Sequence, residues 1–192
     1  MTNKTLTTPA LAIIDQYLHF KIGDAVCSIP YFNNKTAGKR LADRAFIGKG
    51  NPKDIQEEVG SLMVKNHISA DLFTDRSLKK LLVDNNIGID CSGFAYYILD
   101  AESLALGKGP LKKRLCFVNS TGLLGKLRAK LRPVENCDVA TFASDENSEA
   151  ISLNGNAVKP GCIITMTDDS NERDHILVVH QVDYNDSKPI KL

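Results

Sequence analysis

Apolar residues recur at three- and four-residue intervals along the first part of this chain, the spacing of helices with one buried face. Residues 9–20 carry the first such stripe, and Gly23 supplies its stop signal. The stripe consists of Ala10, Ile13, Ile14, Tyr17 and Leu18. Two more helices are predicted, one beginning at Asn51-Pro52 and one capped by Thr74. Helices are therefore expected to build most of the first half of the fold.

Near the end of the chain the pattern changes to short apolar runs that are typical of strands. These runs cover residues 150–153, 161–166 and 176–182, and residues 167–173 form a polar turn between the last two. Helices followed by strands predict an α+β fold with an antiparallel sheet at the end. A length of 192 residues suits a single domain spanning 1–192.

A helix with a cysteine at its first position is predicted between these two regions. The stretch 88–97 reads G-I-D-C-S-G-F-A-Y-Y, in which Asp90 is a suitable N-cap and Cys91 opens the helix. Unpaired backbone N–H groups and the positive end of the helix dipole favour the thiolate form of a cysteine placed there. Ser92 and Gly93 are small and leave room for a substrate carbonyl. Cys91 is therefore a candidate nucleophile.

The D-C-S-G-F sequence at 90–94 resembles the nucleophile motif of the NlpC-type cell-wall peptidases, which have a papain-like fold. Residues 158–164, V-K-P-G-C-I-I, are similar to the first core strand of that family. Residues 174–179 are similar to its next strand, which begins with the catalytic histidine. The resemblance implies Cys91 as nucleophile and His175 as base, in a domain whose N-terminal helices pack on a C-terminal antiparallel sheet.

A second part of the resemblance concerns Tyr31. The segment Ile29-Pro30-Tyr31-Phe32 partly matches a family segment whose tyrosine lies beside the nucleophile. Tyr31 then either donates a hydrogen bond to substrate or oxyanion, with Ser92 nearby, or is a core tyrosine after a turn proline. Residues 33–87 stand where the family has a short loop. The chain therefore resembles a divergent member with a helical insertion that borders the cleft.

The sequence does not identify the residue that would orient the His175 ring. The family takes it from the following strand, which here falls at or beyond residues 188–192, where no His, Asn or Gln occurs. In a continuous strand His180 would point to the opposite face, and Gln181 would lie about 20 Å along the strand. Three alternatives remain for the site. It works as a Cys–His dyad, its third residue lies in a segment that this sequence does not include, or it is degenerate.

These features predict a cysteine-dependent amide hydrolase that uses a Cys91–His175 pair. By resemblance, its substrate is a peptide of bacterial peptidoglycan. The alternatives are an inactive NlpC-like binding module and a Cys–His acyltransferase or deamidase. No cofactor or metal is expected, because the five cysteines show no C-x-x-C spacing. The remaining cysteines are interpreted as small core residues: Cys27, Cys116, Cys137 and Cys162.

The net charge of the chain says little about its binding partners. A net charge of +1 gives no global field for nucleic acid, which is not expected as a partner. No apolar run is long enough for a transmembrane segment, and the first residues lack a signal peptide. The localisation stays open: extracytoplasmic if the protein is exported by another route, and otherwise cytoplasmic.

Residues 108–132 form a local exception, a basic patch with eight Lys and Arg residues and no acid. A leucine stripe within it predicts an amphipathic helix that Pro133 ends: Leu123, Leu124, Leu127 and Leu131. The patch either contacts an anionic polymer or membrane, or is a solvated helix face balanced by the acids of 135–149. We favour the solvated face.

Overall fold

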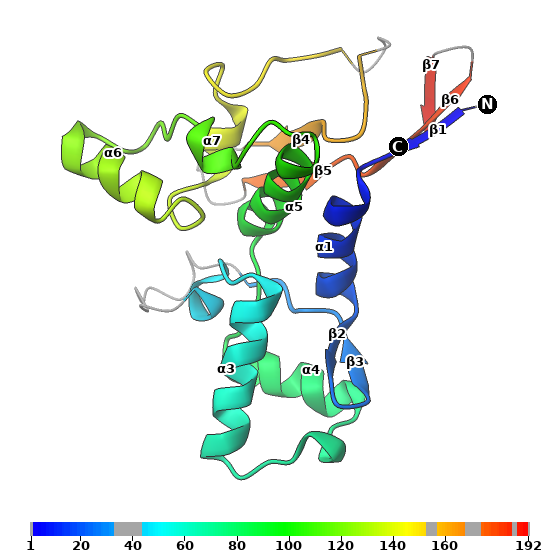
Figure 1. The fold of residues 1–192 in the computed structure, drawn as a ribbon, viewed down its shortest axis with the longest axis vertical. Coiled ribbons are helices and arrows are strands. Elements are labelled where there is room, and N and C mark those ends of the chain that lie inside the picture. The colour runs from blue at the N-terminus through cyan, green and yellow to red at the C-terminus, as the bar shows by residue number, and fades with distance from the viewer. Residues whose placement is uncertain (1, 33–43, 153–156, 168–173, 186–187, 192) are drawn as a thin grey trace. The chain divides into compact units, whose positions relative to one another are not determined.

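The computed structural model describes residues 2–32, 44–152, 157–167, 174–185 and 188–191 (Figure 1). The chain divides into two compact units. We call residues 12–94 the first unit, and residues 1–11 with 95–192 the second unit. Helices α1 and α5 contribute residues to both. The helices and small antiparallel sheets of the described residues confirm an α+β composition.

The first unit is mainly helical. Its elements are α1 (Thr8–Leu18, shared), β2 (Phe20–Ile22), β3 (Ala25–Cys27), the short 3-10 helices η1 (Ala45–Ile47) and η2 (Ala70–Leu72), α3 (Pro52–Lys65) and α4 (Asp75–Asp84). The predicted caps are confirmed, because the Asn51 side chain accepts from Asp54 N and the Thr74 side chain accepts from Ser77 N. Within the predicted insertion 33–87, residues 33–43 lie outside the described residues.

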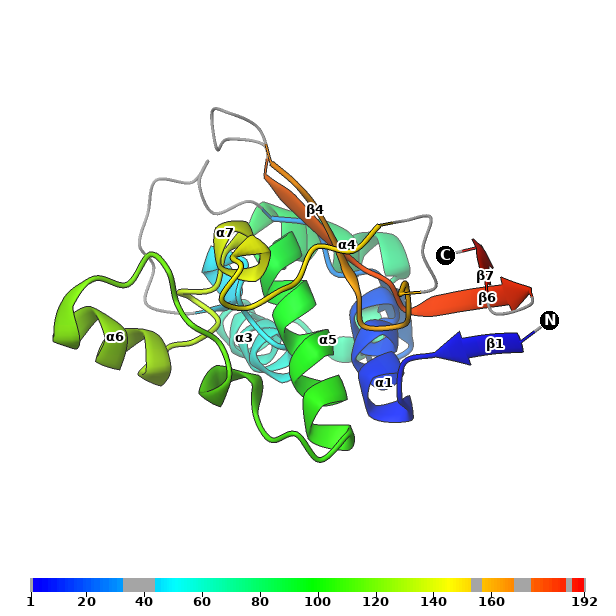
Figure 2. The same cartoon turned by 90° about the horizontal axis from the view of Figure 1, so that it is seen from above.

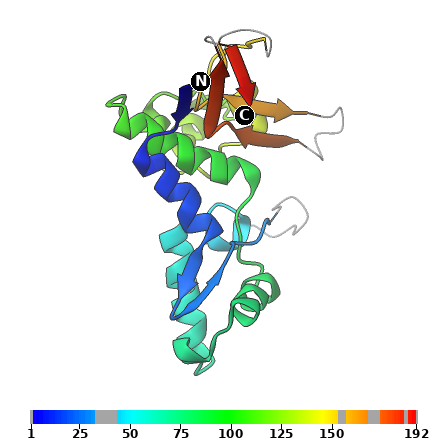
Figure 3. The ribbon, with the colours of Figure 1, turned by 90° about the vertical axis from the view of Figure 1, so that its right-hand side faces the viewer.

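The prediction of a first helix over residues 9–20 with Gly23 as its stop is wrong at its C-terminal end. Helix α1 ends at Leu18, and the next residues form the antiparallel β2–β3 hairpin, with β3 packed on α4 (Figure 3). Burial alternates along Phe20–Ile22, which is the period of a strand and not of a helix. Gly23 has φ +59 in the hairpin turn. Tyr17 is buried, whereas Leu18 at the helix end is exposed.

The second unit holds the remaining helices and two small antiparallel sheets. Its elements are β1 (Thr2–Thr5), α5 (Cys91–Ala105, shared), η3 (Leu111–Lys113), α6 (Gly122–Leu131), α7 (Val139–Ala143), β4 (Ile163–Met166), β5 (His175–Val178), β6 (Gln181–Asn185) and β7 (Lys188–Lys191). Strand β6 lies between β1 and β7 in one sheet, and β4 pairs with β5 in the other (Figure 2).

The predicted strand 176–182 is two strands in different sheets. Val179 N donates to Cys162 O at 2.8 Å, which extends the β4–β5 pairing. The next carbonyl, His180 O, accepts from Leu6 N at 2.9 Å, which begins the β1–β6 pairing. The chain therefore changes partner strand between residues 179 and 180. Face assignments for His180 and Gln181 that assume one continuous strand do not apply.

Two other predicted segments either differ from the structure or lie partly outside the described residues. Residues 150–152 have no regular structure, so the strand predicted at 150–153 is not formed there, and residue 153 is outside the described residues. Residues 168–173 of the predicted polar turn are also outside them. A small core instead forms around Val158, Val179 and Val182, where the Tyr184 hydroxyl donates to Val158 O at 2.7 Å. This bond satisfies a buried phenol and fixes the chain before β4.

Helix α6 forms where the leucine stripe predicts it, but the stripe is not buried. The exposed fractions are 86% for Leu123, 82% for Leu124, 55% for Leu127 and 70% for Leu131. The buried residue of this helix is Ala129. The leucine stripe therefore does not face the protein, and the small residue Ala129 is the one that is buried.

Candidate active site at the start of helix α5

Helix α5 begins at Cys91, as the sequence predicts, and Asp90 caps it. Asp90 Oδ1 accepts a hydrogen bond from Gly93 N at 2.6 Å, and Asp90 O accepts from Phe94 N at 2.9 Å. The first of these bonds satisfies one of the amides that a helix start leaves without an intrahelical partner, and the second is the first backbone bond of the helix itself. Cys91 is half-buried and carries a free thiol. The local sequence alone thus places a thiol at a positive helix end.

Ile89, the residue before this cap, pairs with two other backbone segments, one on each side. Ile89 forms a parallel bridge with Tyr31 and an antiparallel bridge with Lys49. Ile89 N donates to Pro30 O and Phe32 N donates to Ile89 O, both at 3.0 Å. Three chain segments that are distant in sequence therefore meet directly before Cys91, all within the first unit.

A buried lysine joins this arrangement, and the sequence analysis missed it. Lys49 is only 6% exposed, and its Nζ lies 3.0 Å from Asp90 Oδ1 and 2.9 Å from Asp90 Oδ2. The same Nζ donates to Ser92 Oγ at 2.6 Å. Because an ammonium group sits on the Asp90 carboxylate, the negative charge beside the Cys91 thiol is compensated.

Ser92 belongs to the same network. Its side chain is buried, and its hydroxyl donates to Asp90 Oδ1 at 3.1 Å while accepting from Lys49. The single hydroxyl proton is thus committed to the carboxylate, so we assign Ser92 to the scaffold of the site. The backbone N–H groups of Cys91 and Ser92 donate none of the described hydrogen bonds. These two amides are therefore the local donors that could bind an oxyanion.

Gly93, the glycine of the D-C-S-G motif, allows the backbone at Gly48 to lie close to the start of α5. A Cβ at Gly93 would lie 2.9 Å from Gly48 O and 2.9 Å from Ile89 Cδ1. Gly48 itself has φ +71, and a Cβ there would lie 2.7 Å from Phe32 O. Both glycines are therefore needed for the turn that carries Lys49 to pack against the start of α5. Of the predicted insertion, Gly48 and Lys49 lie against this helix start.

Tyr31 is the second side chain at the thiol. Its side chain is hydrogen-bonded to that of Cys91, while the ring remains largely exposed. Partial burial, together with Cys91 and Asp90, raises the pKa of Tyr31 to about 12. The phenol therefore keeps its proton near neutral pH and acts as donor to the sulfur.

We expect Tyr31→Phe to slow alkylation of Cys91 by iodoacetamide at pH 7 by about 3–10-fold, because a donor that stabilises the thiolate is removed. Mass spectrometry of the alkylated peptide measures the rate. Tyr184→Phe is the matched control, since it removes a hydroxyl that bonds to Val158 O in the second unit. Equal alkylation rates for wild type and Tyr31→Phe would show that this hydrogen bond does not influence the sulfur.

The other predicted site residues belong to the second unit. His175 is the first residue of β5, pairs in register with Met166 and is half-buried. His180 is exposed between β5 and β6, and Gln181 begins β6 opposite Thr5. Tyr31, Ser92 and Cys91 are thus brought together within one unit. The pairing of Cys91 with His175 stays a prediction.

The remaining cysteines have different surroundings. All are free thiols, but only Cys137 among them is buried, and Cys116 is exposed, so their interpretation as core residues is wrong for Cys116. Burial raises the pKa of the Cys27 thiol. A hydrogen bond to the Glu146 carboxylate raises the pKa of the Cys116 thiol. Both of these thiols are therefore held in the protonated form at neutral pH.

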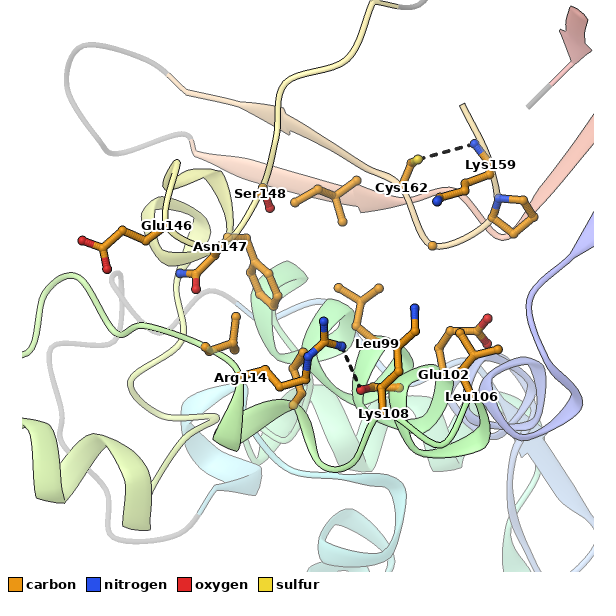
Figure 4. A pocket seen from close by; sticks show the side chains of 17 residues that line it. Leu99, Glu102, Leu106, Lys108, Arg114, Glu146, Asn147, Ser148, Lys159 and Cys162 are labelled. Carbon is orange, nitrogen blue, oxygen red and sulfur yellow. Dashed lines mark hydrogen bonds between the residues drawn. The ribbon is translucent and has the colours of Figure 1, made fainter. Parts of the chain in front are cut away.

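A cavity of about 510 Å³ lies in the second unit, beside the later turns of α5 (Figure 4). Three cationic side chains line it, Lys108, Arg114 and Lys159, together with leucines and Phe142. Cys91 and His175 are not among its lining residues.

Searches of protein-family models, of curated proteins and of solved structures found no match to this chain. Within the described residues, no group of three or more His, Cys, Asp or Glu side chains is arranged to hold a metal ion. The side chains around Cys91 are therefore the basis on which a function is inferred.

Proposed function

We propose that this protein is a cysteine-dependent amide hydrolase with Cys91 as its nucleophile and His175 as its base and acid. The observation that carries the proposal is the environment of the sulfur at the start of α5. A helix N-terminus, a tyrosine donor and a carboxylate compensated by buried Lys49 all act on the Cys91 thiol. Such surroundings are typical of nucleophilic cysteines.

In the first half of the proposed reaction, the Cys91 thiolate attacks the carbonyl carbon of an amide. The C–S bond forms and the carbonyl electron pair moves to oxygen, giving an oxyanion. The N–H groups of Cys91 and Ser92 are the proposed donors to this oxygen, and the Tyr31 hydroxyl becomes a third once the C–S bond has formed and the sulfur no longer needs its proton. Protonated His175 gives its proton to the amide nitrogen, the C–N bond breaks and the amine leaves.

In the second half, a thioester joins the acyl group to Cys91. Neutral His175 takes a proton from water, and the resulting hydroxide attacks the thioester carbonyl. The C–S bond then breaks, releasing a carboxylic acid and restoring the thiolate. If another amine or alcohol replaces water, the same pair performs acyl transfer, which is the alternative activity.

The substrate class follows from the D-C-S-G resemblance. A peptide of bacterial cell wall is the proposed substrate, in a papain-like domain of NlpC type. Lys49 and the turn at Gly48 come from the segment that the resemblance identifies as an insertion. These two residues lie against the helix start that carries Cys91, so their segment is suited to shape the substrate path.

We expect Cys91 to be the thiol that iodoacetamide alkylates fastest at pH 7, by about tenfold over Cys27 and Cys116. Cys91 lies at a helix N-terminus beside a tyrosine donor, whereas the thiols of Cys27 and Cys116 have raised pKa values. Peptide mass spectrometry over a time course measures all three rates in one sample. Faster alkylation of Cys27 or Cys116 would remove Cys91 as the nucleophile.

The hydrolase proposal itself is tested by acid-quenched intact-mass measurements during incubation with a panel of cell-wall peptides. We propose that a peptide-derived acyl group becomes attached to Cys91 and then turns over. An adduct that forms and persists would favour acyl transfer with a missing acceptor. Fast alkylation without any adduct or product would favour the inactive binding module.

A further inference from the structure

Helix α6 presents an apolar surface that the rest of the described chain leaves open. Leu123 and Leu124 are more than four-fifths exposed, and Leu127 and Leu131 are more than half exposed. Isolated exposed leucines are common on proteins, but four on one short helix form a patch that indicates a binding surface.

The four leucines share one side of the helix. At about 100° per residue they fall within an arc of about 100°. Buried Ala129 and half-buried Gly125 lie on the opposite side, which is the side that meets the protein. The helix is thus attached through small residues and directs its large apolar side chains outward.

Cations flank this leucine arc on both sides. Lys126 and Lys130 follow one edge, Arg128 follows the other, and all three are exposed. Arg132, further along the second edge, is bound to Glu135 at 3.1 Å and contributes less. Residues 108–132 contain no acid, so every charge that this stretch itself places around the leucines is positive.

We propose that α6 binds the surface of a bilayer that contains anionic phospholipids. The leucine arc enters the boundary between headgroups and acyl chains, and Lys126, Lys130 and Arg128 lie at the level of the phosphates. This is the arrangement of interfacial amphipathic helices, which carry an apolar face bordered by basic residues. The inference is independent of the chemistry at Cys91.

The charges and the leucines together select this partner. A nucleic acid would use the cations but would leave the leucines in water. A second copy of the helix would cover the leucines but would bring equal positive charges together. An anionic bilayer satisfies both features at once. At ten residues α6 is too short to cross a bilayer, which takes about 20, so it would lie in the plane of the surface.

The test is sedimentation of the full chain with vesicles of phosphatidylglycerol and phosphatidylcholine in equal parts, compared with phosphatidylcholine alone. We expect about 100-fold stronger partitioning onto the anionic vesicles at low salt, with a large decrease at high salt. The double variant Leu123→Gln with Leu127→Gln should bind at least about tenfold more weakly. Its denaturation midpoint should not change, because both side chains are exposed.

Leu72→Gln is the matched control. This leucine is 69% exposed but lies in η2 beside acidic Asp71, so its replacement should leave vesicle binding unchanged. A spectroscopic readout is also available, because the chain has no tryptophan. Leu124→Trp should shift its emission to shorter wavelength on anionic vesicles, which reports entry of this position into the lipid.

Three results would overturn the proposal. Binding that depends on salt but survives the leucine substitutions would mean adsorption by charge alone. Equal partitioning onto both vesicle types would remove the role of the cations. Concentration-dependent self-association without lipid binding would assign the leucine arc to contacts between copies of the chain.

Discussion

Lys49→Met should lower the free energy of unfolding by about 3–5 kcal/mol, because it leaves a buried carboxylate without its cation. The Lys49 and Asp90 side chains are only 7% and 14% exposed, so water replaces the lost ammonium poorly. Ser92 also loses the donor that its hydroxyl accepts from. Chemical denaturation followed by far-ultraviolet circular dichroism measures the change.

Two comparison variants identify the cause. Lys80→Met removes an exposed pair in which Nζ lies 2.7 Å from Asp84 Oδ2, and should change stability by less than about 0.5 kcal/mol. Adding Asp90→Asn to Lys49→Met removes the unpaired charge and should restore a large part of the loss. A cost for Lys49→Met no larger than that for Lys80→Met would contradict a scaffold role for the buried pair.

The same variants are informative about the thiol. In Lys49→Met the Asp90 carboxylate is uncompensated beside Cys91, and its negative charge then opposes a thiolate. Slower alkylation of a variant that is still folded would separate this electrostatic effect from loss of structure. The buried lysine would then link the stability of the helix start to the reactivity of its cysteine.

Features set by neighbouring residues could be predicted from the sequence. The caps at Asn51, Thr74 and Asp90 depend on side chains within three residues of the amides they bind, so the helices begin where the pattern places them. Cys91 at the first position of α5 follows from the same local rule. Tyr31 was a candidate only through family resemblance, and the Ile89 bridge is what brings it to the sulfur.

Features set by distant pairing could not be predicted in the same way. Lys49 stands between two glycines, a local hint of a tight backbone, but its carboxylate partner is 41 residues away. The apolar run ending in Val182 gives no sign that the chain changes sheets at residue 180, since both strands need the same residue types. The leucines of α6 show helical spacing, but spacing alone cannot tell which face meets the protein.

Cys91→Ala and His175→Ala should each lower turnover of a hydrolysed peptide by about 1,000-fold or more. Without the thiol no acyl intermediate forms, and without the imidazole no group delivers a proton to the leaving amine. Steady-state release of the amine product measures turnover. Because the proposed mechanism puts the two residues on one reaction path, the double variant should be no slower than the slower single variant.

The matched control is His180→Ala, which removes an exposed imidazole five positions further along and should retain most of the turnover. Alkylation of Cys91 should persist in His175→Ala, because the helix start, Tyr31 and the compensated Asp90 remain to support a thiolate. Loss of turnover with retained alkylation would therefore assign His175 to proton transfer. Full turnover in His175→Ala would exclude it as the base, and turnover in Cys91→Ala would exclude thiol chemistry altogether.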